Sequence, residues 1–268
     1  MPFFTHGGAD IFYEDVGDGP LVIAAHGMMS PGYWTISGVS GVLGLGYRVV
    51  SFDFRGHGRT RATSGFDVET LASDIGALAG HLGADKFHLV GHGTGGIVAL
   101  RYAMGHSDRL HSLIAMDCAS ATAPMPPEHF ENQARAIGQT LADDMYRSMR
   151  ASEAGFFFAS LDEAHVPSSA DYMITRMFAG NDPAMLAEFM RGFFADPSPQ
   201  DERLADIACP TLCAVGEHDM AFRETMTRMV GAIPGAELAV LKGVGHMTAF
   251  ENPQQTIDLL REFLDRQK

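Results

Sequence analysis

The chain has 268 residues, of which 19 are Lys or Arg and 33 are Asp or Glu, so its formal net charge is −14 at pH 7. This length suits one large domain or a domain that carries an insertion. A hydrophobic share of 46% with 19% charged residues is typical of a soluble globular protein. Because phosphates attract faces rich in Lys and Arg, the acidic excess argues against nucleic acid as a partner.

The cysteines indicate a reducing compartment. Cys118, Cys209 and Cys213 are odd in number and widely spaced, so they form neither a disulfide framework nor a zinc ribbon. The first residues, MPFFTHGGADIFYED, lack the basic segment and apolar stretch of a signal peptide. No apolar run approaches the ~20 residues that span a bilayer. We therefore expect a cytoplasmic protein with no membrane partner.

Short apolar runs alternate with segments of helical periodicity along most of the chain. Helices are expected over 67–82, 95–105, 221–231 and 254–266. Strands are expected at Phe3–Thr5, Ile11–Asp15, Leu21–Ala25, Arg48–Phe52, Phe87–Val90, Ser112–Met116, Thr211–Val215 and Glu237–Leu241. This alternation predicts an α/β fold with a mostly parallel eight-stranded sheet and helices on both faces. The first two strands are expected to form an antiparallel hairpin through Gly7-Gly8.

The alternation stops between about Ser120 and Ala208, where the sequence predicts helices only. These helices are Pro127–Arg150, Glu153–Ser160, Ser169–Phe178 and Pro183–Phe194. We expect residues 1–120 and 206–268 to form the core domain and residues 121–205 to form a helical cap. The cap is rich in Met and Phe; burial against the sheet explains most of these residues, and a pocket for an apolar ligand is the alternative where chemistry lies beneath them.

The segment GHGTGG at residues 91–96 has two interpretations, and the first is a dinucleotide-binding turn. Gly91, Gly93 and Gly96 fit the pattern G-x-G-x-x-G between a strand and a helix, and Asp117 closes the next strand. In an NAD-binding oxidoreductase the turn would hold a pyrophosphate and the aspartate would bind ribose hydroxyls. However, the motif begins 90 residues into the chain and leaves the other motifs without a role.

The second interpretation is a nucleophile elbow, G-x-S-x-G, with Gly93 at the position of the serine. Such an elbow lifts its central residue above the sheet, and the order elbow, acid, histidine then follows along the chain. Four further motifs follow predicted strands: His26-Gly27-Met28-Met29, the loop FDFRGHG at 52–58, Gly216-Glu217-His218-Asp219 and Gly245-His246-Met247-Thr248. Each motif alone is a weak signal, but five in this order strongly favour the elbow.

Together the motifs HGMM, DFRGHG, GHGTGG, GEHD and GVGHMTAFENP resemble the α/β-hydrolase family over nearly the whole chain, most closely the branch of enol-lactonases, small-molecule esterases and perhydrolase-like arylesterases. The resemblance implies that His246 is the general base and that Asp219 orients it. It also implies that the N–H groups of Met28 and Thr94 form an oxyanion hole. Glu217 and Asp117 are the alternative acids, in that order. No cofactor is implied, and His88 and His92 are not expected to bind a metal.

Glycine at position 93 is the departure from the family pattern. A residue without a side chain cannot form an acyl-enzyme, and loss of the serine in a serine protease costs ~10⁶ in turnover. The chain is therefore expected to be nearly inactive as an esterase. Three accounts follow. The first, which we favour, is an engineered Ser→Gly variant of a working hydrolase. The second is a natural chain in which His246 activates water or runs a non-hydrolytic proton transfer, and the third is a ligand-binding pseudoenzyme. The expected substrate is an ester or lactone with an apolar acyl or aromatic group.

Overall fold

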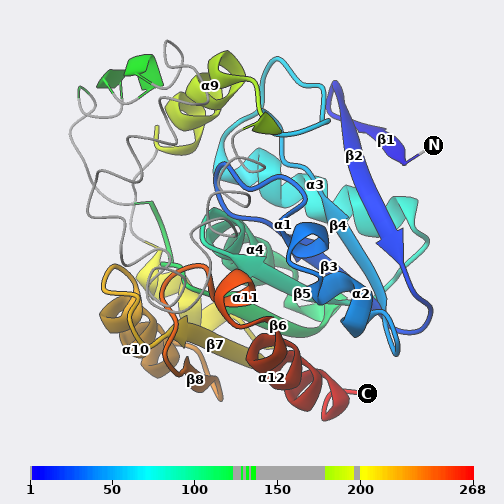
Figure 1. Cartoon of the computed structure of the whole chain (residues 1–268), viewed down its shortest axis with the longest axis vertical. Coiled ribbons are helices and arrows are strands. Elements are labelled where there is room, and N and C mark those ends of the chain that lie inside the picture. Colours follow the sequence, from blue (N-terminus) through cyan, green and yellow to red (C-terminus); the bar gives the residue numbers. More distant parts are fainter. Residues whose placement is uncertain (1, 123–127, 129–130, 133, 137–178, 196–199) are drawn as a thin grey trace.

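The computed structural model describes residues 2–122, 128, 131–132, 134–136, 179–195 and 200–268 (Figure 1). Its centre is an eight-stranded sheet with the order β1-β2-β4-β3-β5-β6-β7-β8. The strands are β1 Phe3–His6, β2 Ala9–Val16, β3 Leu21–Ala25, β4 Arg48–Phe52, β5 Phe87–His92, β6 Leu110–Met116, β7 Thr211–Gly216 and β8 Glu237–Leu241. The eight predicted strands are confirmed, each end lying within two residues of its predicted position.

The predicted hairpin at the start of the chain is also confirmed. Strands β1 and β2 pair antiparallel with His6 opposite Ala9. The turn residues Gly7 and Gly8 have φ values of 50° and 75°, which suits the two-residue turns that match the twist of a hairpin. Strand β2 also pairs antiparallel with β4, whereas the pairs from β3 to β8 are parallel.

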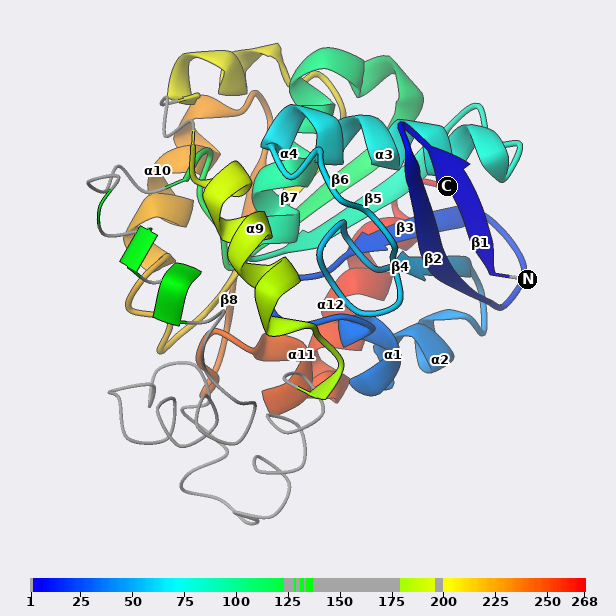
Figure 2. The same ribbon diagram turned by 90° about the horizontal axis from the view of Figure 1, so that it is seen from above.

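Helices cover both faces of the sheet, as predicted (Figure 2). On one face lie α3 (Val68–His81), α4 (Thr94–His106) and α10 (Arg223–Ala232); on the other lie α1 (Tyr33–Ile36), α2 (Val39–Leu43) and α12 (Pro253–Asp265). Successive side chains of a strand point to opposite faces. In β3, for example, Ile23 joins the core beneath α3 and α4, and Val22 joins the core beneath α12. Shorter helical turns are η1 Ser107–Arg109, η3 Asp201–Asp206 and α11 Thr248–Glu251.

Of the four helices predicted for the cap, the described residues include the last, α9 (Pro183–Phe193). It starts where Asp182 accepts a hydrogen bond from the N–H of Ala184, and proline in its first turn fits the helix start. Its Phe189 ring lies edge-on to the His57 ring, with 4.4 Å between centroids. Helix α9 therefore packs on the loop that follows β4. The other three predicted helices fall largely or wholly outside the described residues, and the division into core and cap stays a prediction.

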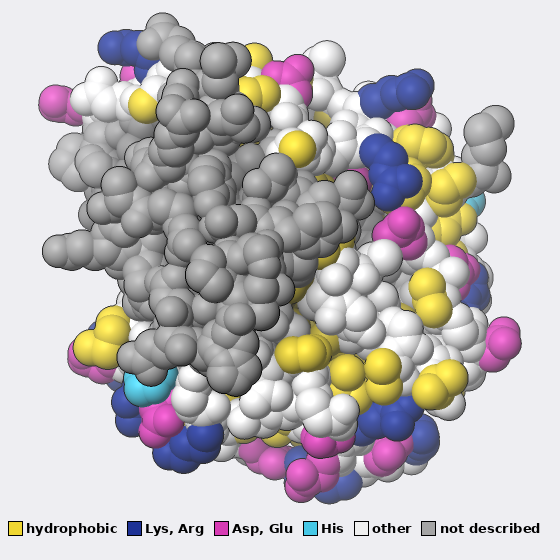
Figure 3. Space-filling model, viewed as in Figure 1, with side chains coloured by type: hydrophobic (Ala, Val, Ile, Leu, Met, Phe, Trp, Pro, Cys, Tyr) yellow, Lys and Arg dark blue, Asp and Glu magenta, His cyan; other side chains and the backbone are white. Residues whose placement is uncertain are grey.

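Three further observations concern the surface, the thiols and the helix lengths. Acidic and basic side chains are interspersed around the rim of the described surface in Figure 3. The three cysteines carry free thiols and are buried. In the part of the chain that the structure describes, no helix has both the length and the apolar character needed to cross a membrane.

Candidate active site

The turn at Gly93 joins β5 to α4 in a conformation that glycine favours. Gly93 has φ 56° and ψ −120°, a region that residues with a side chain rarely adopt. A Cβ atom on Gly91 would lie 2.3 Å from the Gly95 carbonyl oxygen, and a Cβ atom on Gly95 would lie 2.3 Å from the Ala25 carbonyl oxygen. Both flanking positions therefore need glycine, which is the steric logic of a nucleophile elbow.

This close approach predicts a large loss of stability in Gly95→Ala. The added methyl group collides with strand backbone, so we expect the free energy of unfolding to fall by ~1–3 kcal/mol or more. Gly80→Ala is the matched control, because Gly80 lies in α3 with no atom within 4 Å of the added Cβ. There alanine should stabilise the helix by ~0.5–1 kcal/mol. Urea unfolding of both variants measures the difference, and equal stabilities would contradict the packing argument.

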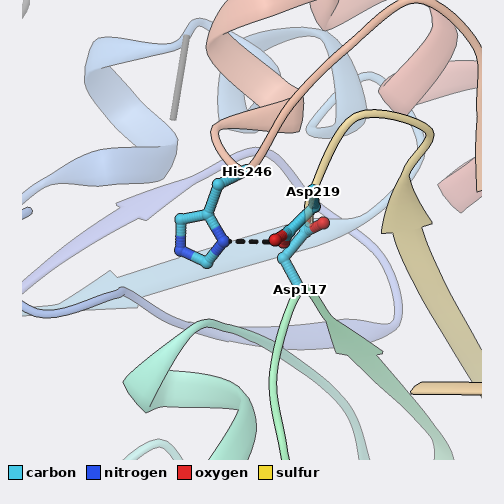
Figure 4. Close-up of side chains that lie close together, drawn as sticks. All are labelled: Asp117, Asp219 and His246. Atoms are coloured by element: carbon cyan, nitrogen blue, oxygen red, sulfur yellow. Dashed lines mark hydrogen bonds and ion pairs between the residues drawn. The ribbon is translucent and has the colours of Figure 1, made fainter. Parts of the chain in front are cut away.

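His246 and Asp219 come together above the carboxyl ends of the strands (Figure 4). Nδ1 of His246 lies 2.8 Å from Oδ2 of Asp219, and both residues are buried. The other oxygen, Oδ1, accepts the N–H groups of Ala221 and Phe222 at 3.1 Å each. Burial raises the pKa of Asp219. The hydrogen bond from His246, the positive charge of His246 and the hydrogen bonds from these two amides lower it by more, so the pKa of Asp219 lies below its usual range. The carboxylate is therefore ionised and fixed in orientation.

The Nε2 atom of His246 faces the elbow. A Cβ atom built on Gly93 would lie 3.6 Å from this nitrogen and 3.6 Å from the Gly27 Cα, and it meets no closer atom. A hydroxyl one bond further out would come within hydrogen-bonding distance of the imidazole. The structure thus places Gly93, Asp219 and His246 in one site, in the order that a catalytic triad uses.

A second carboxyl group, that of Asp117, lies beside the carboxyl group of Asp219 (Figure 4). It follows β6 with φ 48° and is fully buried. Its Oδ1 accepts the N–H of Gly216 at 2.9 Å, and its Oδ2 contacts the Thr248 hydroxyl at 3.1 Å. Burial raises the pKa of Asp117 well above its usual range, and the charge of Asp219 raises it further. Burial and the neighbouring Asp219 charge therefore both favour the protonated form of Asp117.

The three acids considered as partners of His246 have different contacts in the structure. Glu217, the first alternative to Asp219, instead contacts Lys242 Nζ at 2.9 Å and the N–H of Gly243 at 3.0 Å. Asp117, Asp219 and His246 offer potential metal-ligand atoms within 4.8 Å of one another. Those atoms already bond one another or neighbouring backbone and hydroxyl groups. A cation here would have to displace these hydrogen bonds, so the geometry favours a hydrogen-bonded cluster.

The loop His26-Gly27-Met28-Met29 borders Gly93, since a Cβ atom on Gly93 would lie 3.6 Å from the Gly27 Cα. Among the described residues, no hydrogen bond uses the backbone N–H of Met28 or of Thr94. The Thr94 N–H belongs to the first turn of α4, where backbone donors lack partners within the helix. Both groups are therefore available where the sequence predicts an oxyanion hole, and that role stays a prediction.

Other histidines near the site act as neutral hydrogen-bonding groups. His26 accepts the N–H of Phe54 at Nε2, so its Nδ1 carries the proton and donates to the Gly27 carbonyl at 2.6 Å. Burial lowers the pKa of His26 to about 4. His92 contacts the His246 carbonyl oxygen through Nε2 at 2.8 Å, and burial lowers its pKa to about 3. These two imidazoles support the loops around Gly93, and sequence reasoning gave no signal for their partners.

The dinucleotide interpretation predicts a ribose-binding role for Asp117, and the structure opposes it. With its carboxyl group buried and bonded to Gly216 and Thr248, Asp117 presents no oxygen to a ligand. We therefore expect a flat fluorescence titration with NADH up to millimolar concentration. Saturable binding that disappears in Asp117→Ala would restore the dinucleotide interpretation.

Comparison with known proteins decides the family. The family model described as the alpha/beta hydrolase family matches residues 6–259. The chain belongs to the α/β-hydrolase family. This assignment agrees with the strand order, with the elbow between β5 and α4 and with the His246–Asp219 pair.

Relatives of this α/β hydrolase carry several names. A putative non-heme chloroperoxidase from Synechocystis is 25% identical over 98% of this chain and 100% of its own length. An enol-lactonase from Burkholderia xenovorans has the same fold, with a TM-score of 0.86 and 21% identity over 98% of this chain and 100% of that one. A thermophilic esterase from Thermogutta terrifontis gives a TM-score of 0.84 with 26% identity, covering 100% of this chain and 97% of that one.

Proposed function

We propose that this α/β hydrolase carries the site of a carboxylic ester or lactone hydrolase, with Gly93 in the place of the nucleophilic serine, and that the chain with glycine is nearly inactive on ordinary esters. One observation carries the proposal: the Cβ direction of Gly93 points toward His246 Nε2 at 3.6 Å, and Asp219 holds the other ring nitrogen. A hydrolase of this type needs such a base and orienting acid, and the side chain that Gly93 lacks relative to serine is the hydroxymethyl group.

The chemistry follows from the positions of the groups. A hydroxyl on residue 93 would pass its proton to His246 and attack the acyl carbon, while Asp219 stabilises the imidazolium that forms. The N–H groups of Met28 and Thr94 would then stabilise the negative oxygen of the tetrahedral intermediate. The intermediate would then expel the alcohol portion of the ester, which takes the proton from His246, and leave an acyl-enzyme on residue 93. In a second step water would pass a proton to the same histidine, attack the acyl carbon and release the acid and the free hydroxyl of residue 93. With glycine, the base and the donors remain but the covalent route is closed.

The surroundings of His246 support an apolar substrate. The Phe222 ring lies 5.2 Å from the His246 ring. Met28, next to the Gly27 that contacts the Cβ position of Gly93, packs against the apolar cluster that includes Met190 of α9. Apolar walls with a few polar groups are typical of small-molecule sites. The enol-lactonase and the esterase named above act on substrates of the proposed class, as their names state. The buried free thiols support the cytoplasmic location that we propose with this function.

A second candidate function is slow hydrolysis by a water molecule that His246 activates. The observation that favours it is that a group at the Cβ position of Gly93 fits without a clash and contacts His246 Nε2 at 3.6 Å. We expect any residual hydrolysis by the chain with glycine to disappear in His246→Ala. Residual rates that are equal in both proteins would exclude this route.

The test of the main proposal is hydrolysis of p-nitrophenyl acetate by Gly93→Ser beside the chain with glycine. A burst followed by sustained turnover in the serine variant alone supports the proposal. Equal, slow rates in both proteins would contradict it.

A further inference from the structure

The backbone of Met29, next to the predicted oxyanion donor Met28, is held at both of its polar groups. Met29 has φ 64°, a conformation that a residue with a long side chain rarely adopts and that neighbouring contacts must maintain. Its N–H donates to Nε2 of His57 at 3.2 Å. Its carbonyl oxygen accepts from Nδ2 of Asn181 at 3.1 Å.

His57 is suited to act as a permanent acceptor. Because Nε2 accepts the Met29 N–H, the ring proton lies on Nδ1, which faces the Arg55 carbonyl oxygen at 3.2 Å. The ring packs between His26, 5.0 Å away, and Phe189 of α9, 4.4 Å away. Burial lowers the pKa of His57 well below its usual value, and proximity to His26 lowers it further. The acceptor nitrogen therefore stays unprotonated.

Asn181 joins two loops through its two side-chain atoms. It lies two residues before α9, and its Oδ1 accepts the N–H of Gly58 at 3.1 Å while its Nδ2 reaches Met29. One amide group thus ties the loop after β4 to the loop after β3. Asn181 and Met29 are 152 residues apart in the sequence, so this contact exists only in the folded chain.

We infer that His57 and Asn181 are positioning residues that hold Met29 in its unfavourable conformation and thereby aim the Met28 N–H at the reacting oxygen. Without them the Met29 φ angle relaxes, and the peptide planes on either side of Met28 rotate. Because an oxyanion donor acts only at a defined position, this rotation lowers turnover more than substrate binding. The inference rests on the proposed function for its effect on catalysis, and on the contacts alone for its effect on the loop.

The first experiment uses Asn181→Asp and measures the loop directly in the chain with glycine at 93. Aspartate keeps an oxygen for the Gly58 N–H but replaces the donor to Met29 with a second acceptor. We expect the Met29 amide proton to exchange with solvent at least ~10-fold faster, since its loop opens more often. Asp182→Ala is the matched control, because it removes the α9 cap without touching Met29. Unchanged exchange in Asn181→Asp would overturn the inference.

The second experiment measures p-nitrophenyl acetate hydrolysis in the Gly93→Ser background. Asn181→Asp should lower kcat ~10–100-fold, less than the ~10²–10³-fold loss of an oxyanion donor itself, and should leave KM within about threefold. Asp182→Ala should leave kcat unchanged. His57→Gln, which offers an amide oxygen as acceptor, should retain more activity than His57→Leu. A normal kcat in a folded Asn181→Asp protein would overturn the inference. An inactive Gly93→Ser protein would instead overturn the proposed function, and amide exchange would then decide the role of Asn181.

Discussion

Gly93→Ser is expected to raise kcat for p-nitrophenyl acetate by at least ~10³-fold over the chain with glycine. In a serine protease, loss of the serine costs ~10⁶ in kcat, while the oxyanion hole and binding alone retain ~10³–10⁴ over water. Here the base is oriented, the donors are available, and the Cβ position lies 3.6 Å from His246 Nε2. Stopped-flow absorbance at the nitrophenolate band measures both the burst and the steady rate.

Two controls accompany this prediction. Because triad members act as a unit, adding His246→Ala to Gly93→Ser should return the rate to that of the chain with glycine. The serine variant should also be less stable by ~1–3 kcal/mol, since φ at position 93 is 56° and a side chain is strained there. Thermal unfolding checks this loss and shows that the variant is folded at the assay temperature. A rate that survives His246→Ala would assign the hydrolysis to another site.

Asp219→Asn in the Gly93→Ser background is expected to lower kcat by ~10⁴-fold, as the equivalent change does in a serine protease. Asp219 Oδ1 accepts the N–H groups of Ala221 and Phe222, so the asparagine oxygen is held there and its NH₂ group must face His246 Nδ1. The imidazole then carries its proton on Nε2 and cannot accept one from the serine. Steady-state kinetics near neutral pH measure the loss.

Glu217→Gln provides the matched control for Asp219→Asn. It also exchanges a carboxylate for an amide in the same loop, but its side chain faces Lys242 and Gly243. We expect kcat within about twofold of the Gly93→Ser parent, because exposed ion pairs contribute little. Comparable losses in the two variants would mean that loop charge, and not the contact with His246, controls the rate.

The fold was predictable because its signals are local. Strand β5 is buried at every residue, and its Leu89 and Val90 lie on opposite faces, which is typical of a parallel strand covered on both sides. The elbow could be predicted because the backbone around Gly91 and Gly95 leaves no room for a side chain. The tight turn therefore requires glycine at both positions, and these glycines are seen in the sequence. The glycine at position 93 is equally local, and its chemical consequence follows from the absence of a side chain.

Contacts between distant loops could not be predicted in the same way. Asp117 lies next to Asp219 because β6 pairs with β7 in the register Met116 opposite Ala214, and no local pattern specifies that register. Asn181 reaches Met29 only after α9 has packed on the loop that follows β4. A single asparagine before a helix carries no signal for such a contact.

The pair of carboxyl groups beneath His246 bears on how sites of this kind diverge. The two aspartates come from the ends of neighbouring strands, β6 and β7, and each has an oxygen within 4.8 Å of a ring nitrogen of His246, although Asp219 is the one that bonds it. A lineage can therefore move its working acid from one strand end to the next by changing side chains around the pair, while the backbone and strand register stay as they are. In such a protein the residue after β7 would no longer be an acid. Its histidine would still have a carboxylate partner, supplied from the end of β6.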